Sequence, residues 1–230
     1  MGKAELIVAL DLVSEDEALD LVVRLLPDVD FFKVGLQLFV SSGSNVVSKI
    51  KDMGGRVFLD LKLHDIPNQV ANAVTEASNL GVDLLTIHTF GGREMMSKAI
   101  EARDKADSDM KIVGVTILTS MDNNDLKGIG IESGTDLAVM HQAKLAIDSG
   151  LDGVVSSGYE VGNLRRELGD KPVLVTPGIR PGGIDNDDQK RSVTPLEAAE
   201  MGSDFLVVGR PVIFFDDPKA IALAIKREIE

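Results

Sequence analysis

Short runs of β-branched and other apolar residues recur along the chain at fairly even spacing. Each run is followed by a polar turn and then by a stretch with the apolar spacing of a helix. The pattern predicts eight strands, each followed by a helix: Leu6–Asp11, Phe31–Gly35, Arg56–Lys62, Leu84–His88, Lys111–Leu118, Gly153–Ser156, Val173–Pro177 and Phe205–Gly209. Ser14 with Glu17 predicts a capping box for the first helix, and Pro67, Pro195 and Pro218 stand where helix starts would fall.

Strands that alternate with helices indicate a parallel sheet with right-handed crossovers. Eight such units in 230 residues match the size of a closed (β/α)8 barrel. No linker interrupts the series, so we expect one α/β domain, a TIM barrel, over residues 1–230. An open doubly wound sheet is the alternative.

Two connections are long, Thr119 to Gly134 and Ile179 to Thr194. Both follow strands, and therefore both lie on the C-terminal face of a barrel, where barrel enzymes carry their chemistry. Long Gly-rich loops on this face are lid candidates. The alternative is that they are surface insertions.

Composition narrows the class of protein. The net charge of −13 and the presence of one Tyr and no Trp argue against a nucleic-acid partner. The absence of Cys excludes disulfides, thiolate metal sites and a cysteine nucleophile. The apolar run Leu6 to Leu10 is far too short to cross a membrane. We therefore expect a soluble, cytoplasmic protein that binds neither membrane nor nucleic acid.

The third strand carries an unusual set of charges. In Asp60-Leu-Lys62-Leu-His-Asp65, alternation places Asp60 and Lys62 on one side of the strand and the leucines on the other. A structural ion pair is one interpretation. Buried ion pairs rarely repay their desolvation, however, and charge clusters concentrate at functional sites, which favours a functional role.

Polar residues also end other strands on the same face. Asp11 ends the first strand, Lys33 lies in the second and Thr119 follows the fifth. Because the interior of a barrel is otherwise filled with branched apolar side chains, their convergence predicts a site. Lys33 would be desolvated unless carboxylates face it, and Asp60 and Asp65 can supply them.

The ends of the seventh and eighth strands predict a phosphate site. Arg180 follows Pro177-Gly178-Ile179, and Gly209-Arg210 ends the eighth strand, where barrels often bind phosphate. The arginines would add bidentate charge, and Gly209 would allow close approach. The alternative is that both arginines are ordinary surface charges.

Other motifs indicate no cofactor or metal. Gly128-Ile129-Gly130 lacks the spacing of a dinucleotide fingerprint. Residues 185–189, Asp-Asn-Asp-Asp-Gln, lack the Gly and Glu of a calcium loop and are interpreted as part of a lid. His64, His88 and His141 lack the spacing of zinc ligands, and His64 is expected to support packing near the site.

Taken together, these motifs resemble orotidine 5'-monophosphate decarboxylase of the bacterial type. The residues that carry the resemblance are Lys33, the run from Asp60 through Ile66-Pro67, Thr176 to Arg180, and Val208 to Arg210. The similarity extends over the whole chain. It implies a barrel homodimer that converts orotidine monophosphate to uridine monophosphate and carbon dioxide in pyrimidine synthesis, with no metal or cofactor.

The resemblance also implies roles for individual residues. Lys62 would be the proton donor, Asp60 would face the departing carboxylate, Lys33 would complete the network and Asp65 would enter from the partner subunit. The substrate-binding residues would be Asp11 and Lys33 at the ribose, Thr119 at the pyrimidine, Gln189, Arg180, Gly209 and Arg210 at the phosphate, and Ile66. One departure is Gln69, which stands where the family commonly has Thr near the ribose hydroxyls.

Two other functions remain open at this point. A related group of magnesium-dependent sugar-phosphate decarboxylases and aldolases shares the Asp-x-Lys-x-x-Asp strand, but these enzymes typically place a Glu where this chain has Lys33, which would repel a divalent ion. A non-catalytic sensor of phosphate ligands is the other alternative, and the intact array of Asp60, Lys62 and Asp65 argues against it.

Overall fold

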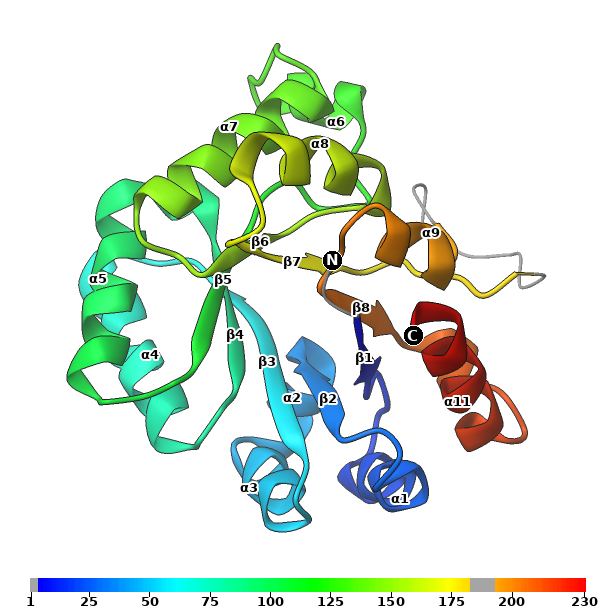
Figure 1. Ribbon diagram of the computed structural model, residues 1–230. Helices are drawn as coiled ribbons and strands as arrows, with labels where there is room; N and C mark the ends of the chain where they lie inside the picture. The colour runs from blue at the N-terminus through cyan, green and yellow to red at the C-terminus, as the bar shows by residue number, and fades with distance from the viewer. Residues whose placement is uncertain (1–3, 183–192) are drawn as a thin grey trace.

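The computed structural model describes residues 4–182 and 193–230. Within these residues, parallel strands close into a barrel in chain order, with the last strand paired to the first (Figure 1). The strands are β1 (Glu5–Ala9), β2 (Phe31–Gly35), β3 (Arg56–Leu63), β4 (Leu84–His88), β5 (Lys111–Val115), β6 (Gly153–Val155), β7 (Val173–Thr176) and β8 (Phe205–Val208). The predicted (β/α)8 barrel is confirmed, and the open sheet is excluded.

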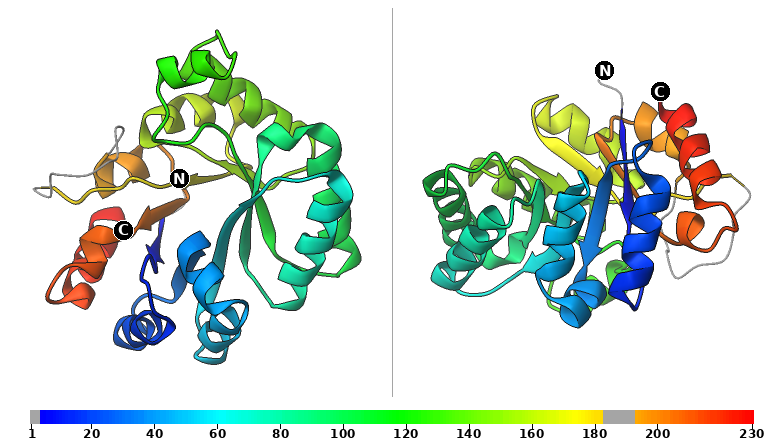
Figure 2. Two further views of the ribbon diagram at one scale, coloured as in Figure 1. Left: turned by 180° about the vertical axis from the view of Figure 1, so that it is seen from behind. Right: turned by 90° about the horizontal axis from the view of Figure 1, so that it is seen from below.

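Helices surround the barrel on all sides, as the two further views show (Figure 2). They are α1 (Glu15–Leu25), α2 (Leu36–Ser42), α3 (Asn45–Asp52), α4 (Pro67–Asn79), the 3-10 helix η1 (Thr89–Gly91), α5 (Gly92–Lys105), α6 (Asn123–Gly128), α7 (Thr135–Asp148), α8 (Gly158–Leu168), α9 (Pro195–Glu200), α10 (Arg210–Ile213) and α11 (Pro218–Ile229). None of the helices in the described residues is long and apolar enough to cross a membrane. The last helix, α11, packs against α1 and β1, which brings the two ends of the series together (Figure 1).

Local sequence explains where several helices begin. Ser14 caps α1 by accepting a hydrogen bond from the backbone N–H of Glu17, at 3.1 Å. Pro67, Pro195 and Pro218 each begin a helix, where the missing N–H of proline costs nothing. The predicted helix starts are therefore confirmed. Of the capping box predicted for α1, the hydrogen bond to Ser14 is formed.

Strand residues alternate between two apolar layers, because successive side chains point to opposite sides of a strand. In β1, Ile7 and Ala9 belong to the cluster inside the barrel, whereas Leu6 and Val8 belong to the cluster between the barrel and its helices. Both sides are buried, which explains why the strands are apolar runs rather than alternating ones.

Strand and loop boundaries differ modestly from the predicted ones. The fifth strand ends at Val115 rather than Leu118, because its partner β6 is only three residues long and pairing stops at Val155. The long connection from Thr119 to Gly134 contains α6, which Asp122 caps in a reciprocal box with Asp125. Most of the second long connection lies outside the described residues.

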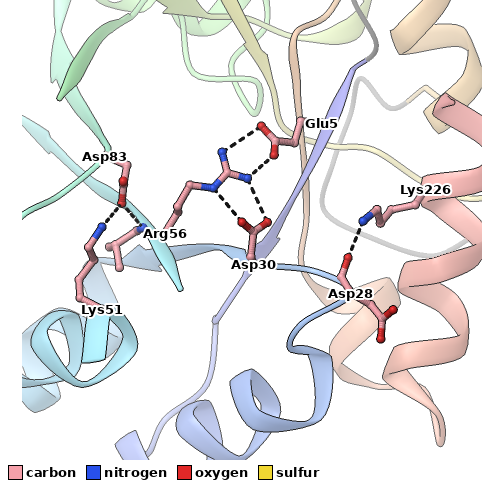
Figure 3. Close-up of polar contacts among 8 residues, drawn as sticks. Glu5, Asp28, Asp30, Lys51, Arg56, Asp83 and Lys226 are labelled. Atoms are coloured by element: carbon pink, nitrogen blue, oxygen red, sulfur yellow. Dashed lines mark hydrogen bonds and ion pairs between the residues drawn. The ribbon is translucent and has the colours of Figure 1, made fainter. Parts of the chain in front are cut away.

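The N-terminal end of the barrel is held by ion pairs (Figure 3). There Arg56 pairs with Glu5 and Asp30 and stacks over the ring of Phe31, with 4.4 Å between the guanidinium carbon and the ring centroid. The Lys226 ammonium donates to the backbone carbonyl of Asp28.

A repeated arrangement at the same end uses the aspartate that immediately precedes β4, β6 or β8. Each such carboxylate accepts both a backbone N–H near the start of the preceding strand and a cation from a helix. The sets are Asp83 with Val57 and Lys51 (Figure 3), Asp152 with Ile112 and Arg103, and Asp204 with Leu174 and Arg165. These contacts tie neighbouring units together at the end opposite the predicted site.

Candidate active site

One cavity opens at the C-terminal ends of the strands. Charged and polar residues from opposite sides of the barrel line it together with apolar side chains such as Phe58 and Val155. The predicted site residues on its wall are Asp11, Lys33, Asp60, Lys62, Thr119, Arg180, Gly209 and Arg210. The structure therefore brings these eight residues together, as the strand ends predict.

Lys33 lies between two carboxylates. Its ammonium is 2.9 Å from Oδ1 of Asp11 and 3.7 Å from Oδ2 of Asp60. The Lys33 and Asp60 side chains are each 12% exposed, whereas that of Asp11 is 51% exposed. Within the chain, the second carboxylate beside Lys33 is thus Asp11, and not Asp65 as the sequence suggested.

Gly35 provides the space that the Lys33 ammonium occupies. A Cβ atom at residue 35 would lie 2.8 Å from Nζ of Lys33 and 3.4 Å from Oδ1 of Asp11. Both residues are on β2, two positions apart, and so share one side of the strand. A glycine here allows the lysine side chain to fold back over the backbone.

The Lys62 ammonium donates to both carboxylate oxygens of Asp60. The Lys62 ammonium is 2.9 Å from Oδ1 and 2.9 Å from Oδ2, and the Lys62 side chain is 32% exposed. The backbone of Lys62 is left-handed, with φ of 50°, which is uncommon for a residue other than glycine. Asp60 is consequently shared by two ammonium groups.

The pairing between β3 and β4 is irregular at this point. Leu59 pairs with Leu85 and Leu63 with Ile87, so four steps along β3 face two steps along β4. Thr86, the residue of β4 between those partners, is fully buried. Its hydroxyl lies 2.9 Å from the backbone nitrogen of Lys62 and 2.9 Å from Oδ1 of Asp60.

The electrostatic setting keeps Asp60 ionised. Burial by itself would raise the pKa of the Asp60 carboxyl, but the Lys62 and Lys33 charges and the hydrogen bonds from Lys62 and Thr86 hold that pKa below its usual value. At neutral pH, a negative charge next to two ammonium groups therefore faces the cavity.

Two histidines adjoin this network. The rings of His64 and His88 stack with 5.4 Å between centroids, and Phe90 lies 5.4 Å beyond His88. Burial, with added repulsion from His64 and Lys62, lowers the pKa of His88 to about 4. His88 is therefore neutral at physiological pH. His64, which was expected to support packing, is exposed and stacks on His88 at the groove.

Positive charge gathers at the opposite wall of the cavity. The backbone N–H of Arg180 donates to the carbonyl of Val193 at 2.9 Å, which holds the segment after β7 against the segment before α9. Arg210 begins α10 directly after Gly209, and a Cβ at residue 209 would lie 3.2 Å from Oδ2 of Asp11. Gln189, the other predicted phosphate ligand, lies outside the described residues.

Asp65 and Ile66 are not on the cavity wall. Asp65 is exposed, and its Oδ1 accepts the backbone N–H of Ile66 at 2.6 Å. Asp65 instead lines a second, open groove with His64, Gln69 and Glu76, and Lys62 borders both this groove and the cavity. Lys62 therefore lies where the cavity adjoins the groove that contains Asp65.

Sequence reasoning missed Thr86, Gly35 and His88 as parts of the site. One signal for Thr86 was available, because it is a polar residue inside the apolar run Leu84 to Ile87 and neighbours the charged strand. The role of Gly35 depends on how Lys33 folds back, which no local pattern encodes.

Comparison with known proteins gives consistent matches over almost the full chain. The family model described as orotidine 5'-phosphate decarboxylase / HUMPS family matches residues 4–225. An orotidine 5'-phosphate decarboxylase of Pseudoalteromonas translucida is 47% identical over 227 residues, covering 98% of this chain and 97% of the relative. One from Syntrophotalea carbinolica is 47% identical over 233 residues, covering 99% and 96%.

A solved structure agrees with these relatives. The crystal structure of orotidine 5'-phosphate decarboxylase from Lactobacillus acidophilus superposes with a TM-score of 0.89 at 38% identity and covers 100% of both chains.

Proposed function

The chain belongs to the orotidine 5'-phosphate decarboxylase / HUMPS family, and on that premise we propose that it converts orotidine 5'-monophosphate to uridine 5'-monophosphate and carbon dioxide in pyrimidine biosynthesis. One observation carries the proposal beyond family membership. Asp11, Lys33, Asp60 and Lys62 form a continuous charged array with contacts of 2.9 to 3.7 Å at the cavity. This array suits a substrate that enters with a negative charge and passes through a carbanion.

The chemistry assigned to the array is heterolytic. The bond between carbon 6 of the pyrimidine and its carboxylate breaks, the electron pair stays on carbon 6, and neutral carbon dioxide leaves. The Lys62 ammonium then donates a proton to carbon 6 and recovers one from water. The product is the uracil ring, and neither oxidant nor reductant is consumed.

Asp60 destabilises the bound substrate more than it destabilises the transition state. The ionised Asp60 carboxylate repels the substrate carboxylate, and this repulsion disappears as carbon dioxide forms. The negative charge that develops on carbon 6 is then attracted by Lys62. At ~4 Å and an effective dielectric of about 20, each unit-charge interaction is worth about 4 kcal/mol, so fixed charges can lower the barrier substantially.

The other wall of the cavity is suited to the 5'-phosphate. Arg180 and Arg210 supply cationic donors, and Gly209 keeps the approach open. Binding of the phosphate far from the reacting carbon can offset the unfavourable placement of the carboxylate beside Asp60. In this proposal Asp11 and Lys33 contact the ribose, and Thr119 contacts the pyrimidine.

The magnesium-dependent reaction of related barrels fits the site poorly. Asp60 is the most enclosed carboxylate of the array, and both Lys33 and Lys62 direct ammonium groups at it. A divalent ion placed there would face two like charges at short range.

We also propose that the enzyme is a homodimer in which Asp65 completes the site of the partner subunit. Support comes from the exposure of Asp65 and from its position on the groove that Lys62 borders from the other side. Two-fold symmetry would make both sites composite in the same way.

Incubation with orotidine 5'-monophosphate in the presence of a chelator tests the function. We expect the ultraviolet absorbance of the orotate ring to fall as uridine 5'-monophosphate and carbon dioxide appear in equal amounts. Lys62→Ala should bind uridine 5'-monophosphate but leave the absorbance unchanged. Binding without turnover by the unmodified protein would indicate a sensor, and turnover only with added magnesium would support the magnesium-dependent alternative.

A further inference from the structure

Thr86 is the one residue of β4 that lies opposite the irregular part of β3. Because Leu59 pairs with Leu85 and Leu63 with Ile87, the three residues from 60 to 62 have Thr86 alone as their counterpart. These three include both members of the Asp60–Lys62 pair. Thr86 is also fully buried, so water does not compete for its hydroxyl.

The direction of both Thr86 hydrogen bonds follows from donor and acceptor chemistry. A backbone N–H only donates, so the Thr86 oxygen accepts from the nitrogen of Lys62 at 2.9 Å. The hydroxyl has a single proton, and the ionised Asp60 carboxylate only accepts, so that proton points to Oδ1 of Asp60 at 2.9 Å. One side chain thereby fixes the backbone of one charged residue and the carboxylate of the other.

The backbone at Lys62 needs such a contact. Its φ of 50° lies in the left-handed region that residues with a Cβ rarely adopt, and such conformations persist where the surroundings over-determine them. This conformation accompanies the return of the Lys62 ammonium to both oxygens of Asp60. The Thr86 oxygen holds the amide of the strained residue.

We propose that Thr86 is a positioning residue for the decarboxylation, and that its hydroxyl sets the relative geometry of Asp60 and the Lys62 ammonium. This inference rests on the proposed function. Thr86 is absent from the cavity wall, so it acts through the two charged residues rather than on the substrate.

The hydroxyl also contributes to the charge state of Asp60. Burial raises the pKa of the Asp60 carboxyl, and the attraction of Lys62 and Lys33 lowers it. The hydrogen bond from Thr86 lowers that pKa as well. Its removal would raise that pKa, so the acid limb of the kcat profile would move to higher pH.

Three variants separate the hydroxyl from the methyl group and from general stability. Thr86→Val removes both hydrogen bonds at nearly constant volume, and Thr86→Ser keeps the hydroxyl. Thr89→Val is the matched control: Thr89 is also fully buried, follows β4 directly and donates its hydroxyl to the carbonyl of Val115 at 2.8 Å, away from Asp60.

We expect Thr86→Val to lower kcat roughly 10- to 100-fold, the loss typical of a hydrogen bond to a charged group. The affinity for uridine 5'-monophosphate should change little, and the acid limb should move to higher pH. Thr86→Ser should recover most of kcat and the pH profile. Thr89→Val should keep both, even if it melts at a lower temperature.

Hydrogen exchange at the amide of residue 62 gives a readout that does not depend on turnover. The amide should exchange faster in Thr86→Val than in the unmodified protein or in Thr86→Ser. Equal kcat in Thr86→Val, an equal loss in Thr86→Ser, or unchanged exchange at residue 62 would each overturn the proposal. An unmodified protein that fails to consume substrate would instead refute the proposed function and leave the exchange result to decide the role of Thr86.

Discussion

The position of the Lys33 ammonium depends on the absence of a side chain at Gly35 as much as on the surrounding charges. The ammonium occupies the space above Gly35, and the atoms nearest to a Cβ added there are the ends of the Lys33 and Asp11 side chains rather than backbone. Flexible ends can move without disturbing the fold. The position of the ammonium in the charged array is therefore sensitive to residue 35, whereas stability is not.

Gly35→Ala should consequently fold normally but lose activity. Because the new methyl group displaces the Lys33 ammonium, we expect kcat/KM to fall roughly 10- to 100-fold, as misplacement of about 1 Å in an active site can do. Gly162→Ala is the control, since a Cβ there meets no atom within 4 Å. A stable Gly35→Ala protein with full activity would show that Lys33 tolerates displacement.

Arg210 tests the assignment of the phosphate wall. Arg210→Ala should weaken binding of substrates that carry the 5'-phosphate and hardly affect the free nucleoside, because the phosphate is the part of the substrate that the guanidinium would contact. Charged hydrogen bonds contribute roughly 1.5–3 kcal/mol, so the loss should be about tenfold to more than a hundredfold. Equal losses for both substrates would assign Arg210 a structural role.

His88 predicts how stability depends on pH. Its pKa of about 4 in the folded protein lies below the ordinary 6.5, so the unfolded chain binds the proton more tightly. The contribution of His88 to the free energy of unfolding is fully present above pH 6.5 and is lost as the pH falls toward 4. Because His88 is only partly buried, solvent screens part of this effect, and from pH 7 to pH 5 the free energy of unfolding should fall by about 1 kcal/mol on this account.

Urea unfolding of the unmodified protein and of His88→Asn at pH 7 and pH 5 measures this contribution. The fall should be smaller in His88→Asn, which cannot be protonated in this range. The same fall in both proteins would assign the acid sensitivity to other groups.

At the scale of elements, local pattern predicted a great deal. The structure confirms the order of strands and helices and the helix starts at proline. It also confirms the alternation along β3, which places Leu59, Leu61 and Leu63 in the outer apolar layer. Each of these depends on residues close together in the sequence, or on the pleat of a single strand.

What the sequence did not predict depends on pairing between distant residues. The bulge at Lys62 is a property of β3 and β4 together, and 24 residues separate Lys62 from Thr86. The choice of Asp11 as the partner of Lys33 likewise depends on the register between β1 and β2. By contrast, α6 had a local signal in Asp122 and Asp125 that was overlooked.

The aspartates that precede β4, β6 and β8 give a test of stability at the element scale. Asp152→Ala leaves the N–H of Ile112 without its acceptor and Arg103 without its strand-end partner, so the free energy of unfolding should drop by about 1–3 kcal/mol. Asp104→Ala is the control, because Asp104 also pairs with Arg103 but is 61% exposed. Its cost should be about 0–1 kcal/mol.

Both variants should retain kcat at 25 °C, because these contacts lie at the end of the barrel opposite the cavity. Urea unfolding and steady-state assays on the same preparations give the two numbers. A loss of kcat in Asp152→Ala without a loss of stability would contradict this separation of the two ends.

At the scale of the whole molecule, the proposed dimer predicts complementation. Lys62→Ala and Asp65→Ala should each be inactive, but mixing them under conditions that allow subunit exchange should restore activity. If Asp65 serves the partner, a heterodimer has one site with both lesions and one intact site. If Asp65 served its own chain, each site would carry one lesion and mixing would restore nothing, provided that exchange is independently confirmed.

The unequal spacing between β3 and β4 also bears on how such a site can be added to a barrel. Four steps from Leu59 to Leu63 face two from Leu85 to Ile87, so the surplus is an even number of residues. An even surplus turns no later side chain to the wrong layer. Insertion of two residues into one strand of a barrel could thus create a position for a charged pair while every core residue keeps its orientation. By this route, evolution or protein design can convert an inactive barrel into a reactive one in a single short step.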